Sequence, residues 1–187
     1  MIKKSLSKYN RGNKNLLTRH TVVLFYWLYY RKNERLLKTM NQEVIKRAGE
    51  LINSKANYVG GGMEGYAVLA LTDEHGYPTA SAMTIARADG INWLTFATSP
   101  DSNKATRIAK CNRASVCIAS SEYNVTLVGT IEVVTDPNCK KESWCEPMND
   151  SMHWSGSDDP NFYVLCFNTE RYNIYFADDD SAAVGEL

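Results

Sequence analysis

The sequence predicts a mainly β domain with short helices, folded as a closed or split β-barrel. Three observations support this fold class. Six or seven short segments have the composition and alternation of strands, and tight turns connect the first of them. The chain also lacks the regular alternation of strand and helix that builds a doubly wound parallel sheet. Together these features favour antiparallel strands on short connections.

A helix and a glycine-rich loop are expected before the first strand. Asn41 can cap a helix that ends near Asn53. Residues 60–65 formally match the GxGxxG pattern of dinucleotide-binding proteins. That motif requires a strand before the loop and a helix after it, whereas here the order is reversed. The glycines therefore indicate a connecting loop.

Apolar periodicity and turn residues set the remaining boundaries. A second short helix is expected from Ser99, a good N-cap, to Cys111, with Pro100 in its first position. A third starts at Asp136 and runs through Trp144. The acidic tail after Asp178 is expected to be frayed. The predicted strands are residues 66–72, 79–87, 91–98, 114–120, 125–135, 162–168 and 171–176.

Charge divides the chain into unlike parts. Residues 1–39 hold ten Lys or Arg and one acidic residue, a net charge of +9, whereas residues 40–187 have a net charge of −9. An acidic body argues against a nucleic-acid-binding domain, which would carry a basic face. We expect residues 1–39 to be a basic extension outside the fold and dispensable for folding. Residues 40–178 then form the barrel domain, and residues 179–187 form the acidic tail.

The extension contains one apolar run, Val22 to Tyr30. This run is about half the length that a membrane span requires, so no span is expected. Three interpretations remain open: an appendage, a contact with a membrane surface, and a targeting segment. No small-x-small cleavage pattern follows the run.

The cysteines predict a reducing compartment, and therefore the cytoplasm. Their number is odd and no CxxC pair occurs, which does not fit a disulfide scaffold. No pair has the spacing of a zinc site, and no metal is expected. The five residues, expected to be buried or half-buried thiols, are Cys111, Cys117, Cys139, Cys145 and Cys166.

The segment from Thr98 to Lys104 is the first candidate binding site. It lies where a strand gives way to a helix, and free backbone N–H groups at a helix start favour an anion. Thr98, Ser99 and Ser102 add hydroxyls, and Lys104 adds a positive charge. The same residues also suit ordinary helix capping, so both interpretations stay open. No catalytic triad can be assembled, which favours a bound cofactor as the source of any chemistry.

Six segments follow one another in a characteristic order: Tyr77–Met83, Ile91–Ser99, Asp101–Lys104, Asn112–Val116, Gly129–Val134 and Asp158–Phe162. In this order they resemble the pyridoxamine 5′-phosphate oxidase-like family of FMN-binding split barrels, most closely its general stress protein branch. The resemblance spans about residues 41–176.

The resemblance implies a six-stranded antiparallel split β-barrel that forms a homodimer with FMN at the subunit interface. It places one strand segment along the flavin ring and the next turn at the phosphate or ribityl chain, with Trp154 approaching the flavin from the partner subunit. The implied ring contacts are Ser81, Ala82, Met83 and Thr84, and the implied contacts to the phosphate or ribityl chain are Thr98, Ser99, Ser102, Asn103 and Lys104.

The chain departs from the family pattern at cationic positions. Ser81 stands where relatives often have arginine, and Asn103 stands where they often have arginine or alanine. The last arginine in the chain is Arg171. A pyridoxamine phosphate substrate would lack its bidentate cation, so that activity is not expected. The expected function is an FMN-dependent oxidoreductase acting on an unknown small substrate or electron donor. The alternatives are a non-catalytic flavin-binding stress protein, a barrel that binds haem or a deazaflavin, and an interaction module without a cofactor.

Overall fold

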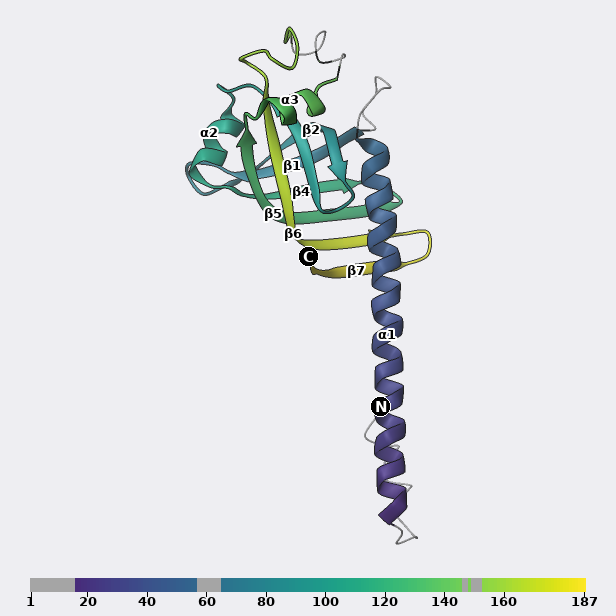
Figure 1. The fold of residues 1–187 in the computed structure, drawn as a ribbon. Helices are drawn as coiled ribbons and strands as arrows, with labels where there is room; N and C mark the ends of the chain where they lie inside the picture. The colour runs from purple at the N-terminus through teal and green to yellow at the C-terminus, as the bar shows by residue number, and fades with distance from the viewer. Residues whose placement is uncertain (1–15, 57–64, 146–147, 149–152) are drawn as a thin grey trace. The chain divides into compact units, whose positions relative to one another are not determined.

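The computed structural model describes residues 16–56, 65–145, 148 and 153–187 (Figure 1). The chain divides into two compact units, residues 1–40 and 41–187. Helix α1 (Leu16–Lys55) supplies the described residues of the first unit and opens the second. None of the described helices has an apolar stretch long enough to cross a membrane. The glycine loop at residues 60–64 lies outside the described residues, and the dispensability of residues 1–39 stays a prediction.

The second unit is built on one antiparallel sheet that closes into a barrel. In order along the sheet, the strands run β3-β2-β1-β4-β5-β6-β7, and β3 also pairs with β6. That pairing closes a six-stranded barrel and leaves β7 as an added strand, which confirms the predicted fold class. The strands are β1 (Tyr66–Thr72), β2 (Pro78–Asp89), β3 (Trp93–Thr98), β4 (Arg113–Ala119), β5 (Tyr123–Val134), β6 (Tyr163–Phe176) and β7 (Ser181–Glu186).

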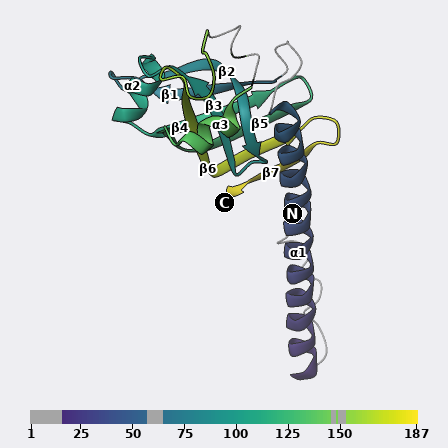
Figure 2. The ribbon, with the colours of Figure 1, turned by 45° about the horizontal axis from the view of Figure 1, so that its top comes forward.

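Alternation along the strands fills the barrel with apolar side chains. Leu69, Phe96 and Leu127 are among the fully buried residues of this core. From α1, the apolar side chains of Val44, Ala48 and Ile52 join the same core. Figures 1 and 2 show this part of α1 and the short helix α2 (Asn103–Lys110) on opposite sides of the barrel. Burial of one helical face, rather than helix propensity, holds the C-terminal half of α1 in place.

A second, smaller core lies outside the barrel wall. Helix α3 (Pro137–Ser143), capped by Asp136, and the chain that follows it cover the outer side of β3 and β6. Thr95 on β3 and Ser143 on α3 are both buried, and their hydroxyl oxygens lie 3.4 Å apart. The apolar members of this cluster are Ala86, Met148, Trp154, Phe162 and Val164.

Two predicted boundaries at the chain ends are wrong. Asn41 does not start a helix, because α1 is already helical at Leu16 and no proline or glycine interrupts residues 16–48. The acidic tail is not frayed, because Ser181–Glu186 pairs with β6 as β7. Asp180 takes a positive φ of 55°, which turns the chain back, and Ala183 is then 2% exposed. An uncharged run inside the acidic tail is therefore strand.

The two closing strands predicted for residues 162–176 are one continuous strand. β6 pairs with β5 on both sides of a β-bulge, at which Val128 faces Arg171 and Gly129 faces Thr169. Glu170, which lies in the gap between the two predicted strands, is the extra residue of the bulge. A Cβ on Gly129 would lie 2.0 Å from the Asn168 carbonyl oxygen, so the close approach of the strands at the bulge requires glycine.

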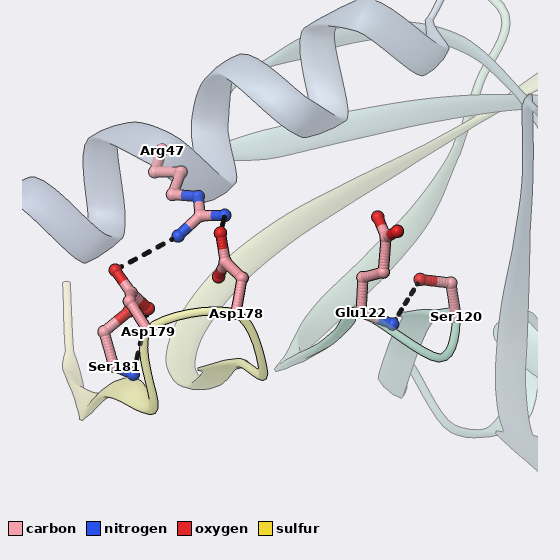
Figure 3. A network of polar contacts seen from close by, with 6 residues as sticks. All are labelled: Arg47, Ser120, Glu122, Asp178, Asp179 and Ser181. Atoms are coloured by element: carbon pink, nitrogen blue, oxygen red, sulfur yellow. Dashed lines mark hydrogen bonds and ion pairs between the residues drawn. The ribbon is translucent and has the colours of Figure 1, made fainter.

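An arginine of α1 ties the helix to the β6–β7 hairpin (Figure 3). The Arg47 guanidinium donates to Asp178 Oδ2 at 2.6 Å and to Asp179 Oδ2 at 3.4 Å. It also lies 3.9 Å from the centroid of the Phe176 ring, a cation–π geometry. The hydrogen bond from Arg47 holds the pKa of Asp178 below its ordinary value.

We predict that Arg47→Ala lowers the melting temperature at neutral pH, and that the difference from the unchanged protein narrows in acid. A carboxyl with a lowered pKa stabilises the folded state above its ordinary pKa, and this stabilisation is lost as the pH falls through the folded-state value. Thermal melts of both proteins over an acid pH series measure the difference. Lys46→Ala, which breaks only the exposed pair with Glu50, is the control and should change little at any pH. A difference that stays constant down to strongly acidic pH would contradict this account.

Candidate functional site

The two candidate segments lie where β2 and β3 separate. β2 pairs with β1 from Pro78 onward, but its pairing with β3 begins only at Ile85, opposite Phe96. β3 pairs with β6 along its whole length, from Trp93 to Thr98, and beyond Phe96 it keeps this partner alone among the described strands. Within the described part of the chain, Pro78–Thr84 therefore has β1 as its one partner strand and leaves its other edge open.

Four candidate residues occupy this open edge of β2. Their side chains alternate between the two faces of the sheet. Ser81 and Met83 share the inner face, and Met83 is 8% exposed. Ala82 and Thr84 share the outer face, where Ala82 is exposed and Thr84 is half-buried. The edge itself offers backbone N–H and C=O groups, which are hydrogen-bonding groups that must find partners.

The second segment leaves β3 and enters α2. Thr98, the last residue of β3, is 3% exposed, and its Oγ1 donates to Ser102 Oγ at 2.9 Å. Ser102 Oγ accepts a hydrogen bond from the backbone N–H of Ala105 at 3.2 Å. This is the geometry of an N-cap, so Ser102 caps α2 and Thr98 positions the cap.

The prediction that Ser99 caps this helix is wrong by one turn. The Ser102 N–H donates to the Ser99 carbonyl at 3.1 Å, which makes residues 99–102 a β-turn with Pro100 in its second position. Proline suits that turn position as well as it suits a first helical position, and the sequence does not separate the two. Asn103 then becomes the first helical residue and is exposed.

Arg107, which was not among the residues expected from the sequence, joins α2 to the strand β2 that carries the first segment. Arg107 Nη1 donates to Thr79 Oγ1 at 2.9 Å, and Thr79 Oγ1 donates to the Leu71 carbonyl at 3.0 Å. Arg107 lies three residues after Lys104 and is therefore its neighbour on the surface of α2. That spacing was visible in the sequence. The contact with Thr79 was not, because it joins residues that are 28 positions apart.

Lys104 and Arg107 carry positive charge that no carboxylate of the described residues neutralises within 4 Å. Both side chains are half-buried. Among the described residues, the ion pairs within 4 Å involve Lys46, Arg47 and Arg87 as cations, and neither Lys104 nor Arg107. Two cations on one face of α2, of which Lys104 lies in the first turn where the helix dipole also attracts negative charge, favour an anionic ligand at the start of α2.

Trp154 lies apart from the other candidates. It is 4% exposed and packs against Phe162, with ring centroids 5.1 Å apart. It belongs to the second core, which contains none of the other candidate residues but does include Ala86 on β2. Ala86 follows Thr84 by two positions, so this core borders the far end of the open edge, where pairing with β3 begins at Ile85. Arg107 and Thr79 lie at the near end of the open edge, next to Pro78.

The histidines and cysteines add no acid–base or metal centre to these segments. His75 and His153 are both exposed, the first in the β1–β2 turn and the second at φ 58° just before Trp154. All five cysteines are free and half-buried. Burial is the main reason that the pKa of Cys166 is raised, so this thiol is a poor nucleophile at neutral pH.

Comparisons with known proteins agree with this fold. The structure is similar to a protein related to general stress protein 26 from Clostridium acetobutylicum, with 23% identity, a TM-score of 0.64, and coverage of 78% of this chain and 95% of that one. It is also similar to general stress protein 26 from Bacillus anthracis, with 20% identity, a TM-score of 0.58, and coverage of 78% and 97%. No curated protein matches the chain. The family described as pyridoxamine 5′-phosphate oxidase like matches residues 63–185, which include β1 to β6, both short helices and all of β7 except its last residue. The chain therefore belongs to the pyridoxamine 5′-phosphate oxidase-like family.

Proposed function

We propose that this protein binds FMN at the open edge of β2 and uses it as an oxidoreductase on a small substrate. The observation that carries the proposal is the position of that edge beside two half-buried cations of α2, which form no ion pair with any other described residue. The hydrogen bond between Arg107 and Thr79 fixes this arrangement. Membership in the family supports the same cofactor.

The residues present fit the two chemically distinct ends of FMN. A phosphate suits the start of α2, where Lys104 supplies charge and the first backbone N–H groups have no partner within the helix. A flavin ring has a polar edge of alternating donors and acceptors, and the free edge of Ser81–Thr84 offers the complementary backbone groups. The site thus provides one anion-binding end and one strand edge.

The cofactor would supply the redox chemistry, because flavins transfer hydride or electrons and no side chain here can do so. The protein binds and orients. Thr98 holds Ser102 in the capping position, which fixes the first turn of α2. A substrate with its own phosphate is not proposed, because Arg171, the last arginine, is exposed beside Glu186 on the β6–β7 ladder.

We further propose that the protein is a homodimer. The outer faces of β2, β1, β4 and β5 share a stretch of uncharged residues, which we call the outer face. Arg113 on β4 and Glu132 on β5 point to the same side and lie at its margin. The larger exposed side chains on it are Tyr66 and Val68, at 37% and 43% exposure. A wide apolar face without charges is typical of a protein–protein interface. The residues that share it are Ala70, Ala80, Ala82, Thr84, Ser115, Cys117, Thr126 and Val128.

Charge on the outer face should break the dimer. We predict that Val68→Lys converts a species of twice 21.1 kDa into one of 21.1 kDa, because an unpaired lysine would be buried at the interface. Sedimentation velocity measures the mass. Tyr77→Lys is the matched control, because Tyr77 is 68% exposed in the β1–β2 turn, outside the outer face. If Val68→Lys remains dimeric, or if the unchanged protein is monomeric with FMN present, the dimer proposal fails.

Visible spectroscopy of the purified full chain tests the cofactor. Added FMN should bind with a perturbed absorbance band and quenched fluorescence, and riboflavin should bind more weakly. A haem or deazaflavin spectrum in the purified protein, or no spectral change with FMN, would contradict the proposal. Steady-state reduction with NADH or NADPH then separates an oxidoreductase from a protein that only stores flavin.

We propose a cytoplasmic location for the protein, which the free cysteines support.

A further inference from the structure

The guanidinium of Arg107 is fixed at the near end of the open edge. It donates to Thr79 Oγ1 at 2.9 Å, and that hydroxyl uses its own proton on the Leu71 carbonyl at 3.0 Å. The hydroxyl can therefore only accept from Arg107, which leaves one orientation for the pair. Thr79 and Ser81 are two residues apart on one strand and share the inner face. Arg107 thus brings a cation from α2 to the strand position beside Ser81.

The charge of Arg107 is available to a ligand. Among the described residues, Asp73 is an acidic group that interacts electrostatically with Arg107. The pKa of Asp73 is lowered mainly by a backbone hydrogen bond, and the charge of Arg107 contributes a minor part. The Asp73 carboxylate, however, accepts from the backbone N–H groups of Tyr77 and His75 at 2.8 and 2.9 Å, and it forms no ion pair with Arg107. These bonds hold the carboxylate within its own hairpin turn. Arg107 therefore remains a half-buried cation with one described hydrogen bond.

An arginine in this state is suited to a phosphate. The guanidinium has five N–H donors in a planar fork, and a single bond to Thr79 leaves most of them free. A phosphate held by Lys104 at the start of α2 would be within one helical turn of Arg107. The two cations would then contact the same anion, one as a point charge and one as a fork.

We propose that Arg107 is a second residue, beside Lys104, that makes the site select FMN over riboflavin, and that Thr79 is a positioning residue which acts through Arg107. This inference rests on the proposed function. It assigns part of the phosphate selectivity to a side chain of α2 that is absent from the candidate set drawn from the sequence. It also accounts for a site that has Ser81 and Asn103 and still needs a second cation.

The test is a comparison of FMN and riboflavin affinities in the full chain and its variants. Arg107→Gln should weaken FMN binding roughly tenfold or more, while riboflavin binding changes less than about twofold. Thr79→Val should weaken FMN by a smaller factor, because the arginine keeps its charge but loses its fixed orientation. Thr79→Ser keeps the hydroxyl and should bind FMN like the unchanged protein.

The double variant decides whether Thr79 acts through Arg107. Adding Thr79→Val to Arg107→Gln should cause no further loss of FMN affinity, because the residue that Thr79 positions is already gone. Independent, multiplying effects would show that Thr79 has a separate role and would overturn that part of the proposal.

The outcomes separate this inference from the proposed function. If the unchanged protein binds FMN and Arg107→Gln does not weaken it, or weakens both flavins equally, Arg107 is a structural link and the inference fails alone. If the unchanged protein binds no FMN, the proposed function fails and the inference fails with it. Should Arg107→Gln not fold, Arg107→Lys carries the test. It keeps the charge without the fork, and a selective loss of FMN affinity is again expected.

Discussion

Lys104→Ala is expected to weaken FMN binding by roughly ten- to hundredfold and to leave riboflavin binding almost unchanged. Lys104 lies in the first turn of α2, where the helix dipole already favours an anion. Loss of one charge-assisted contact to a phosphate costs about 1.5–3 kcal/mol, which corresponds to that range of affinity. Riboflavin lacks the phosphate and does not make the contact. Titration of both flavins against both proteins measures the effect.

Lys110→Ala is the matched control for this variant. Lys110 lies in the last turn of the same helix and is exposed. The Lys110→Ala substitution changes the net charge by the same amount as Lys104→Ala, but at the end of α2 that is remote from the proposed phosphate. FMN affinity should stay within about twofold of the unchanged protein. Equal losses in Lys104→Ala and Lys110→Ala would mean that only general charge matters, and unchanged FMN affinity in Lys104→Ala would remove that residue from the site.

Trp154→Ala should cause the largest loss of stability, about 3–5 kcal/mol. The indole is 4% exposed and packs on Phe162, which Trp144 also contacts edge-on at 5.2 Å between centroids. Removing it leaves a cavity that its neighbours can only partly fill. Chemical denaturation of the two proteins measures the difference, and Trp154→Phe should cost clearly less because most of the volume is retained.

The same variant tests the expectation, drawn from the family resemblance, that Trp154 touches the flavin of a partner subunit. Such a contact would make Trp154→Ala weaken FMN and riboflavin alike with little change in the free energy of unfolding. The burial of Trp154 within its own chain leads us to expect the opposite pattern. A stable Trp154→Ala protein with poor flavin binding would therefore return this residue to the site.

The strands were predictable because each carries its own signal. In β5, for example, Val125, Leu127 and Ile131 alternate with residues that are less buried, as expected for a half-buried strand. Turn residues such as Asp73 and Gly76 mark the first hairpin, and the backbone of both takes part in its turn. The register of the sheet and the closure of β3 on β6 depend on contacts between distant segments, which local patterns do not contain.

The boundaries that failed were those at which two local signals compete. Ser99 and Ser102 are both serines and are equally suited to cap α2. Ser102 is the N-cap in the structure, and the hydroxyl of Thr98 donates a hydrogen bond that holds its side chain in place. Glu170 lies between the two strands predicted from the sequence, but the close pairing of β5 and β6 at Gly129 accommodates it as a bulge in one strand. In both cases a tertiary contact overrode a reasonable local preference.

For the candidate site, the sequence pointed to the two segments but not to the link between them. Ser81–Thr84 and Thr98–Lys104 could be selected from the family resemblance and from helix-start chemistry. The open edge of β2 exists because the pairing of β2 with β3 stops at Ile85 and Phe96, while β3 stays paired with β6 as far as Thr98 in the closed barrel. Arg107 becomes a candidate only once α2 is placed against the first hairpin. Packing, rather than residue type, gives these groups their role.

A crystal structure of the full chain with FMN would test the central claim most directly. We predict the flavin ring along the open edge of β2, within hydrogen-bond reach of the backbone of Ser81–Thr84. The phosphate oxygens should lie about 2.7–2.9 Å from Lys104 Nζ, a charge-assisted distance. A flavin bound elsewhere on the barrel, or a phosphate directed away from α2, would contradict the account.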